Sequence, residues 1–235
     1  MIDFFREIFE YRFLSNAVIA CLLAGVACGI VGTYIVSRRL VFLAGGITHA
    51  SFGGIGIAYY LGMNPIFGAL AFALLSATSM EAMSGRGGSR IREDSAIGIL
   101  WSLGMAVGIL FVFLTPGYAP NLMSFLFGNI LTITTTDLWT MAGLDIVLLL
   151  ALAFFYRPIL YIAFDREYAA TQGAPVQVVG YGMMLLTATA IVLSIRLVGI
   201  VLLISLLTIP PVTVNSLTRS YGRITVWSAV IAAVG

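Results

Sequence analysis

The sequence contains no lysine, a single histidine, two cysteines and only 9% charged residues in 235 positions. A nucleotide-binding P-loop requires Gly-x-x-x-x-Gly-Lys-Ser/Thr, so a chain without lysine cannot contain one. One histidine, with no second ligand close to it, does not supply the three protein ligands of a catalytic zinc site. A formal net charge of +2 is not the signature of a nucleic-acid-binding surface. Any ATP hydrolysis that this chain uses must therefore take place on another subunit, and no nucleic acid is expected as a partner.

Hydrophobic residues make up 60% of the chain. A soluble domain carries about 25% charged residues and cannot hide this much apolar surface from water, so the excess must face membrane lipid. The apolar runs are continuous and do not alternate, which favours helices over a transmembrane barrel. The composition therefore predicts an all-α, polytopic transmembrane helix bundle that forms one domain over residues 1–235.

About 20 apolar residues are needed to cross the bilayer as a helix. We expect about eight such spans, the last of which begins near Ile224 and is cut short at Gly235. The natural chain is therefore expected to continue beyond this sequence. The first seven spans are Asn16–Val36, Val41–Leu61, Pro65–Met83, Ser95–Leu114, Leu138–Phe155, Val176–Ile195 and Val198–Leu217.

Two further segments are apolar or amphipathic but do not cross. Residues Met1 to Arg12 carry several charges and are typical of a short interfacial helix. Between the fourth and fifth spans, Pro120 to Asp137 contains an apolar stretch too short to cross, followed by a run of threonines. We interpret this segment as a re-entrant half-helix.

Arginine is the only marker for the positive-inside rule in this chain. If the half-helix does not cross, nine arginines share one side, and Arg6, Arg12 and Arg196 lie on the other. A crossing segment would weaken this bias. We therefore expect an external N-terminus, with these arginines in the cytoplasm: Arg38, Arg39, Arg86, Arg90, Arg92, Arg157, Arg166, Arg219 and Arg223.

His49 is the only histidine, and it follows Arg38 and Arg39 by roughly ten residues, which at about 1.5 Å each places it near the middle of the membrane. An ionisable group there is costly and is a functional candidate, and imidazole is a ligand for transition metals. The alternative is a neutral histidine that is hydrogen-bonded between helices. Thr48 and Ser51, close to it in sequence, are candidates to line the same pathway.

The loop from Phe164 to Pro175 is predicted to hold a short polar helix. Asp165 can cap its start, Glu167 adds negative charge in its first turn, and Gly173 can end it. Such a rigid element is either a docking site for a partner or an interfacial connector.

Two other segments allow a structural and a functional interpretation. Glu93 and Asp94 stand at the start of a span, where the helix dipole favours carboxylates, and capping alone explains them. Pro210 and Pro211 interrupt the seventh span and remove backbone donors. Pro210 is therefore a candidate for a kink that lines a pathway, although a purely structural kink fits equally well.

At these four places the chain resembles the permease family of ATP-binding-cassette importers for zinc, manganese and iron. The family pattern Phe-Leu-Gly-Asp-Ala-Leu-Ser-His-Ala-Ser after an arginine-rich turn is similar to residues 42–51. The acidic Glu-Asp-Thr/Ser-Ala-Ile-Gly stretch is similar to residues 93–98, the coupling helix to residues 165–173, and the late Val-Gly-x-Leu-Leu…Ile-Pro helix to residues 198–210. The resemblance covers essentially the whole chain.

This resemblance implies a permease fold of the cobalamin and siderophore importer type in the bacterial plasma (inner) membrane. It implies a homodimer with cytoplasmic ATPase subunits and an extracellular or periplasmic metal-binding protein. It also implies that His49 contacts a transported divalent metal, with no cofactor bound permanently. Asp165, Arg166, Glu167 and Gly173 would belong to the helix that couples the chain to the ATPase.

Gly45 departs from the family pattern, which has an aspartate four residues before the histidine, on the same helix face. The missing carboxylate leaves three possibilities: an acid from another element or chain, a softer or weaker ligand set, or a different substrate. Other functions that we considered are an ion-coupled secondary carrier, an intramembrane enzyme and a structural subunit of a larger complex.

Overall fold

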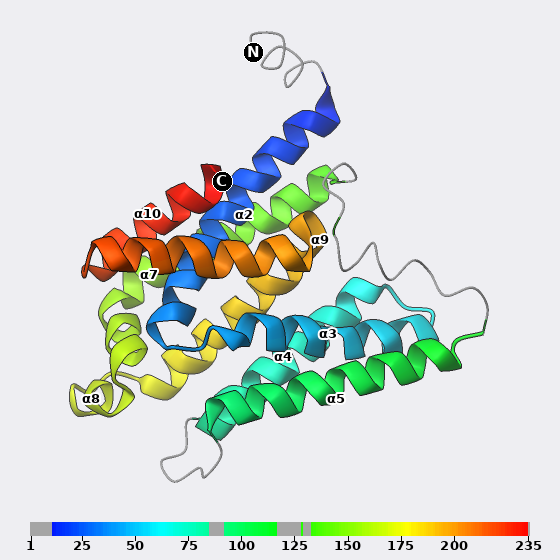
Figure 1. Cartoon of the computed structure of the whole chain (residues 1–235), viewed down its shortest axis with the longest axis horizontal. Coiled ribbons are helices and arrows are strands. Elements are labelled where there is room, and N and C mark those ends of the chain that lie inside the picture. The colour runs from blue at the N-terminus through cyan, green and yellow to red at the C-terminus, as the bar shows by residue number, and fades with distance from the viewer. Residues whose placement is uncertain (1–10, 85–91, 117–127, 129–132, 235) are drawn as a thin grey trace. The chain divides into compact units, whose positions relative to one another are not determined.

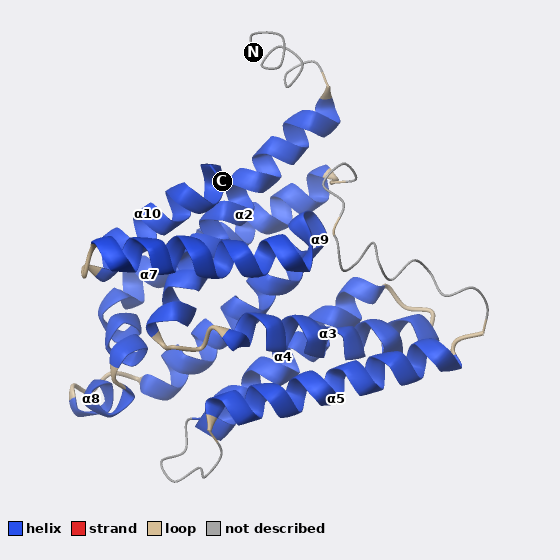
Figure 2. Cartoon of the chain, in the orientation of Figure 1, coloured by secondary structure: helices blue, strands red, loops and turns tan. Residues whose placement is uncertain are grey.

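The computed structural model describes residues 11–84, 92–116, 128 and 133–234. All regular structure in these ranges is helical, as Figure 2 shows, so the all-α prediction is confirmed for the described part of the chain. The helices are α2 (Arg12–Ser37), α3 (Phe42–Tyr60), α4 (Pro65–Ser84), α5 (Glu93–Leu114), α7 (Thr135–Phe164), α8 (Arg166–Thr171), α9 (Val176–Leu217) and α10 (Tyr221–Val234).

Five of these helices, α2, α4, α5, α7 and α9, are long and apolar enough to cross a membrane. Helix α9 combines two of the eight expected spans, α3 is rich in glycine and carries threonine and histidine, and the 14 residues of α10 reach the last position before Gly235. The count of eight spans stays a prediction. The expected interfacial helix at Met1–Arg12 and the half-helix at Pro120–Asp137 lie largely outside the described residues.

Helix α9 has 42 residues, which at about 1.5 Å each is twice the thickness of the hydrocarbon layer. It is interrupted at Gly199, whose φ of 78° and ψ of 169° are not helical. Glycine adopts such angles without a steric penalty. This break separates the two expected spans, whereas the backbone stays helical through Pro210 and Pro211. The break in α9 therefore lies at Gly199, close to the gap expected between the two spans, and the role of Pro210 stays a prediction.

Helix α7 contains a second break, at Phe155, where φ is −114° and ψ is 23°. Pro158 follows three residues later and has no N–H to donate to the preceding turn, and its ring crowds the carbonyl four residues before it. Proline is a common cause of such kinks. The single expected span Leu138–Phe155 thus corresponds to the part of α7 before the kink.

The chain forms two compact units, each built from segments that are far apart in sequence. The first unit comprises residues 1–33, 123–151 and 193–235, and the second comprises residues 34–122 and 152–192. Three helices connect them, because α2, α7 and α9 each contribute to both units. One domain over residues 1–235 remains a prediction.

In the second unit, α3 packs closely against α4 and α5, which Figure 1 shows as neighbouring ribbons. Gly53 faces Gly104, Gly56 faces Gly108, and Gly54 faces Gly68, and a Cβ atom at Gly53, Gly54 or Gly56 would meet the backbone of the other helix. The residue numbers of the paired glycines increase along both α3 and α5, so these two helices run in the same direction. Small residues permit this close approach where no water is present to drive association.

In the first unit, α2 makes the same kind of contact with α10 and α9. Gly25 lies against Ala233 and Gly29 against Ala229, so α2 and α10 run in opposite directions. Gly32 lies against the backbone of Leu207 in α9. Glycine on α2 therefore lets three helices of this unit approach one another closely.

We predict that Gly56→Ala destabilises the protein, because the new methyl group would overlap the carbonyl of Gly108. Overpacking of this kind costs about 1–3 kcal/mol. The matched control is Gly98→Ala in α5, where a Cβ atom meets nothing within 4 Å. Thermal unfolding of the detergent-purified protein should show a lower midpoint for Gly56→Ala and an unchanged or slightly higher one for Gly98→Ala. Equal midpoints for the two variants would contradict the packing described for α3 and α5.

Candidate functional site

His49 projects from α3 toward α5, where its imidazole stacks on the indole of Trp101. The two ring centroids are 4.5 Å apart and the ring planes differ by 9°. Both residues are half-buried. Because the lone pair of an imidazole nitrogen lies in the plane of the ring, a flat stack covers one face of His49 and leaves its nitrogen-bearing edge open. The stacked histidine can therefore still act as a ligand.

Thr48 and Ser51 lie beside His49 in α3, and both are buried, with 2% of each residue exposed. The Ser51 hydroxyl donates a hydrogen bond to the Thr48 carbonyl over 2.6 Å. The Thr48 hydroxyl has no hydrogen-bond partner among the described residues. Of the two hydroxyls, that of Thr48 is thus the one available to a ligand. Pro210 is buried in the first unit, and His49 belongs to the second.

In the described part of the chain, no group of three or more His, Cys, Asp or Glu side chains could hold a metal ion. A metal at His49 therefore has one strong ligand from these residues. A site of this kind suits a cation that is bound and released again better than a structural metal, which is held by four protein ligands.

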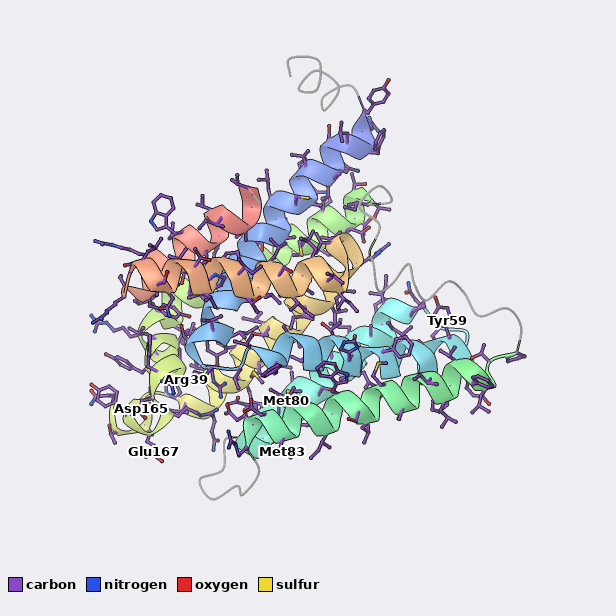
Figure 3. All side chains as sticks on the ribbon, in the orientation of Figure 1. Arg39, Tyr59, Met80, Met83, Asp165 and Glu167 are labelled. Atoms are coloured by element: carbon purple, nitrogen blue, oxygen red, sulfur yellow. The ribbon has the colours of Figure 1, made fainter. Side chains whose placement is uncertain are left out.

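Helix α8 forms as the sequence predicts. The Asp165 carboxylate accepts hydrogen bonds from the backbone N–H groups of Glu167 (2.9 Å) and Tyr168 (3.0 Å), which is an N-cap. Gly173 has a positive φ of 72°, the left-handed conformation that ends many helices. Asp165, Glu167 and Gly173 are exposed, and Figure 3 shows the first two at the tip of this element.

Arg166 has a different environment from its neighbours in α8. Its guanidinium turns toward α4 and forms an ion pair with Glu81 over 2.6 Å, and its side chain is only 21% exposed. The Glu81 side chain is 1% exposed and also accepts a hydrogen bond from Arg38 over 3.2 Å. Arg38 reaches Glu93 at the start of α5 over 3.1 Å. A single buried network thus connects α8, the end of α2, α4 and α5.

This network changes the interpretation of Glu93. Capping alone does not account for it, because its carboxylate also neutralises Arg38, whereas Asp94 pairs only loosely with exposed Arg92 at 3.7 Å. Burial alone would lower the pKa of the Arg38 guanidinium. Tyr34, Glu81 and Glu93 outweigh this effect, so that the pKa of Arg38 is raised above its usual value.

A small pocket lies beside the network and is lined by Arg38, Glu81 and Glu93 together with apolar side chains that include Met80 and Met83. Figure 3 shows both methionines at the same end of the second unit as Asp165 and Glu167, while Tyr59 lies at the other end. The carboxylates of the pocket already face arginines. Because arginines neutralise its carboxylates, the pocket is not a free cation site.

Sequence reasoning missed Glu81, Trp101 and Asp145. Glu81 lies inside an expected span, two residues from its end, and this position could have marked it as a partner for an arginine. Trp101 gave no signal, because an aromatic residue in an apolar helix is ordinary.

Asp137, within the expected half-helix, pairs with Arg196 and accepts a hydrogen bond from the Thr134 hydroxyl over 2.7 Å.

Asp145 lies within α7, and 5% of the residue is exposed. Neither of its carboxylate oxygens has a hydrogen-bond partner in the described part of the chain. An unpartnered carboxyl group in a transmembrane helix is costly and is a functional candidate in its own right. The described part of the membrane interior therefore holds a buried carboxyl group that sequence reasoning did not single out.

A model of the ABC 3 transport family matches residues 10–235. The chain belongs to this family. It is 40% identical over 219 residues to an uncharacterised membrane protein of Synechocystis sp., covering 93% of this chain and 77% of that protein. It is 37% identical over 216 residues to the manganese transport system membrane protein MntC of Halalkalibacterium halodurans, covering 92% and 73%.

Solved structures agree with this membership. The chain superposes on PsaBC from Streptococcus pneumoniae, solved in complex with Fab, with a TM-score of 0.83 and 30% identity, covering 100% of this chain and 84% of that one. An inward-facing putative metal-chelate type ABC transporter shares the fold, with a TM-score of 0.73 at 13% identity, covering 97% and 76%. The family and these neighbours confirm an ABC permease fold in a multi-pass membrane protein.

The buried network makes a prediction about stability. Replacing Glu81 by glutamine leaves Arg38 and Arg166 without their shared counter-charge, and removing one partner of a buried ion pair costs about 3 kcal/mol or more. Asp94→Asn is the control, because its ion pair with Arg92 has side chains that are 56% and 85% exposed and is worth less than about 1 kcal/mol. Thermal unfolding should show a clearly lower midpoint for Glu81→Gln only. A Glu81→Gln midpoint equal to the wild-type value would contradict a stabilising role for the network.

Proposed function

We propose that this chain is the membrane-spanning permease subunit of an ATP-driven importer for divalent transition metal ions in the bacterial inner membrane. The observation that carries the proposal is the family match over residues 10–235, together with 37% identity to a manganese transport permease over 92% of the chain. Manganese is therefore the first cargo to test, and zinc and iron are the competitors. The metal is the substrate of transport, and no permanently bound cofactor is proposed.

The engine of transport is a separate ATPase subunit, because a chain without lysine has no P-loop. Helix α8 is the proposed docking element. Its exposed residues, Asp165 and Glu167, are available to a partner, and Gly173 ends it sharply. Arg166 supports the same role from within, since its ion pair with Glu81 ties α8 to α4. A displacement of α8 would thereby be transmitted to α4 through the ion pair of Arg166 with Glu81.

The proposed path of the cation passes His49 in the second unit, with Thr48 as a neighbouring oxygen donor and Ser51 as a further lining candidate. In the first unit, Pro210 stays a separate lining candidate. Helix α4 packs against α3 at Gly54 and Gly68. A displacement of α4 would therefore also move α3, the helix that carries His49. This chain of contacts supports alternating access, in which closure of the ATPases reorients the helices around the bound cation.

Two copies of the chain are proposed to pair as a homodimer, which would bring two His49 side chains to one translocation pathway. An extracellular or periplasmic binding protein would deliver the metal to the outer face. With the expected arginine distribution, α8 faces the cytoplasm, where ATP is available.

The proposal is tested by reconstituting the permease with its ATPase and binding protein in proteoliposomes and following uptake of Mn²⁺. We predict uptake that needs ATP and all three components, and that falls at least about tenfold in His49→Ala, which loses the one strong ligand. Trp139→Phe is the control, because Trp139 is 78% exposed on the outside of α7.

Uptake without ATP or without the ATPase would contradict the function. Undiminished uptake by His49→Ala would remove His49 from the pathway and leave the transporter assignment intact.

A further inference from the structure

The helix position one turn before His49 on the same face of α3 is occupied by Gly45. A Cβ atom placed on Gly45 would touch the indole of Trp101, at 3.4 Å from Cζ3 and 3.7 Å from Cη2. These are ordinary van der Waals contacts, so an alanine fits. An aspartate side chain extends beyond its Cβ atom, and its carboxylate would have to displace the ring or turn away from it. The indole therefore fills the space that a second ligand from α3 would need.

The same indole also fixes the imidazole of His49. The rings are nearly parallel, with centroids 4.5 Å apart, and such aromatic pairs are favourable beyond their buried area. Rotation of the imidazole out of this plane would lose the stack. The direction in which the ring nitrogens can accept a metal is thereby restricted.

We propose that Trp101 is a positioning and specificity-determining residue of this permease. By stacking on His49 it holds the imidazole in place, and by occupying the space above Gly45 it leaves no room for a carboxylate at that position. This inference rests on the proposed function, because it assumes that the transported metal passes His49.

The consequence for the cargo follows from ligand preference. Carboxylate oxygens suit manganese, whereas imidazole suits zinc and iron. A site that offers imidazole without an adjacent carboxylate therefore favours manganese over zinc less than a site with both ligands would. We expect this permease to transport Zn²⁺ in measurable competition with Mn²⁺.

The test measures initial rates of ATP-driven Mn²⁺ and Zn²⁺ uptake by the reconstituted complex for wild type, Gly45→Ala, Gly45→Asp, Trp101→Phe and the double variant Gly45→Asp/Trp101→Ala. We expect the double variant to raise the Mn²⁺:Zn²⁺ ratio at least about tenfold, as a new carboxylate joins His49. Gly45→Asp alone should stay near the wild-type ratio, because the indole still occupies the space. Gly45→Ala should keep the wild-type ratio, because it adds no ligand. Trp101→Phe should lower both uptake rates, since the imidazole loses part of its stack, without raising the ratio, since no carboxylate is added.

A ratio that rises as much in Gly45→Asp alone as in the double variant would overturn the blocking role of Trp101. An unchanged ratio in the double variant would overturn its role in specificity. The ratio is compared within each variant, so a lower yield of folded protein does not change it.

A second measurement does not depend on transport. With Trp139→Phe and Trp227→Phe in place, Trp101 is the only tryptophan left, because the chain has three. Mn²⁺ is expected to quench its fluorescence, and His49→Ala should abolish the quenching. Quenching that survives in His49→Ala would overturn the inference. Loss of ATP-driven uptake by the wild type, in contrast, would refute the proposed function itself.

Discussion

The close approach of α3 to α4 and α5 is the constraint on which the candidate site depends. Glycines on all three helices bring backbone against backbone, and the added Cβ atoms that other residues would carry have no room. This contact sets the register between α3 and α5. It places Trp101 opposite His49 and Gly45. A packing requirement at Gly53, Gly56, Gly104 and Gly108 therefore determines the chemistry one to two turns away. In lipid, where apolar surface gains little by association, such packing is a main source of helix affinity.

Electrostatics complements this packing at one end of the second unit. Arg38, Glu81, Glu93 and Arg166 come from four separate places in the chain and neutralise one another around the buried side chains of Arg38 and Glu81. Buried ion pairs contribute less net stability than their short distances suggest, because both partners lose their hydration. Their value here is geometric: α8 cannot move as a free loop, since its first residue is bound to a transmembrane helix. Rigid attachment is what a coupling element requires.

Much of the fold could be predicted from the sequence because it depends on local rules. Apolar runs marked the long helices, Asp165 and Gly173 marked the limits of α8, and the family resemblance supplied the permease fold. Five helices meet the length and hydropathy of a span, and one of them, α9, combines two expected spans. Helix α3 is not among the five, since the glycines that let it pack also lower its hydropathy. The count of eight spans stays a prediction.

The candidate site was only half predictable. His49 stood out as the single histidine, and Gly45 as the missing acid. The partners of the charged residues are 43, 55 and 85 positions apart in sequence, and no local pattern encodes such distances. Trp101 could not be predicted either, because its contact with His49 depends on the register between α3 and α5. The break at Gly199 lies close to the gap that was expected between two spans. The prolines were expected to interrupt the second of these spans, and the backbone there stays helical.

The central claim is that the metal in transit binds His49 on the glycine-packed helix α3. Pulsed electron paramagnetic resonance of Mn²⁺ bound to the purified permease and ATPase complex tests this claim most directly. The account predicts modulation from an imidazole nitrogen in the wild-type spectrum and its loss in His49→Ala. A wild-type spectrum without nitrogen coupling, or a coupling that persists in His49→Ala, would contradict it.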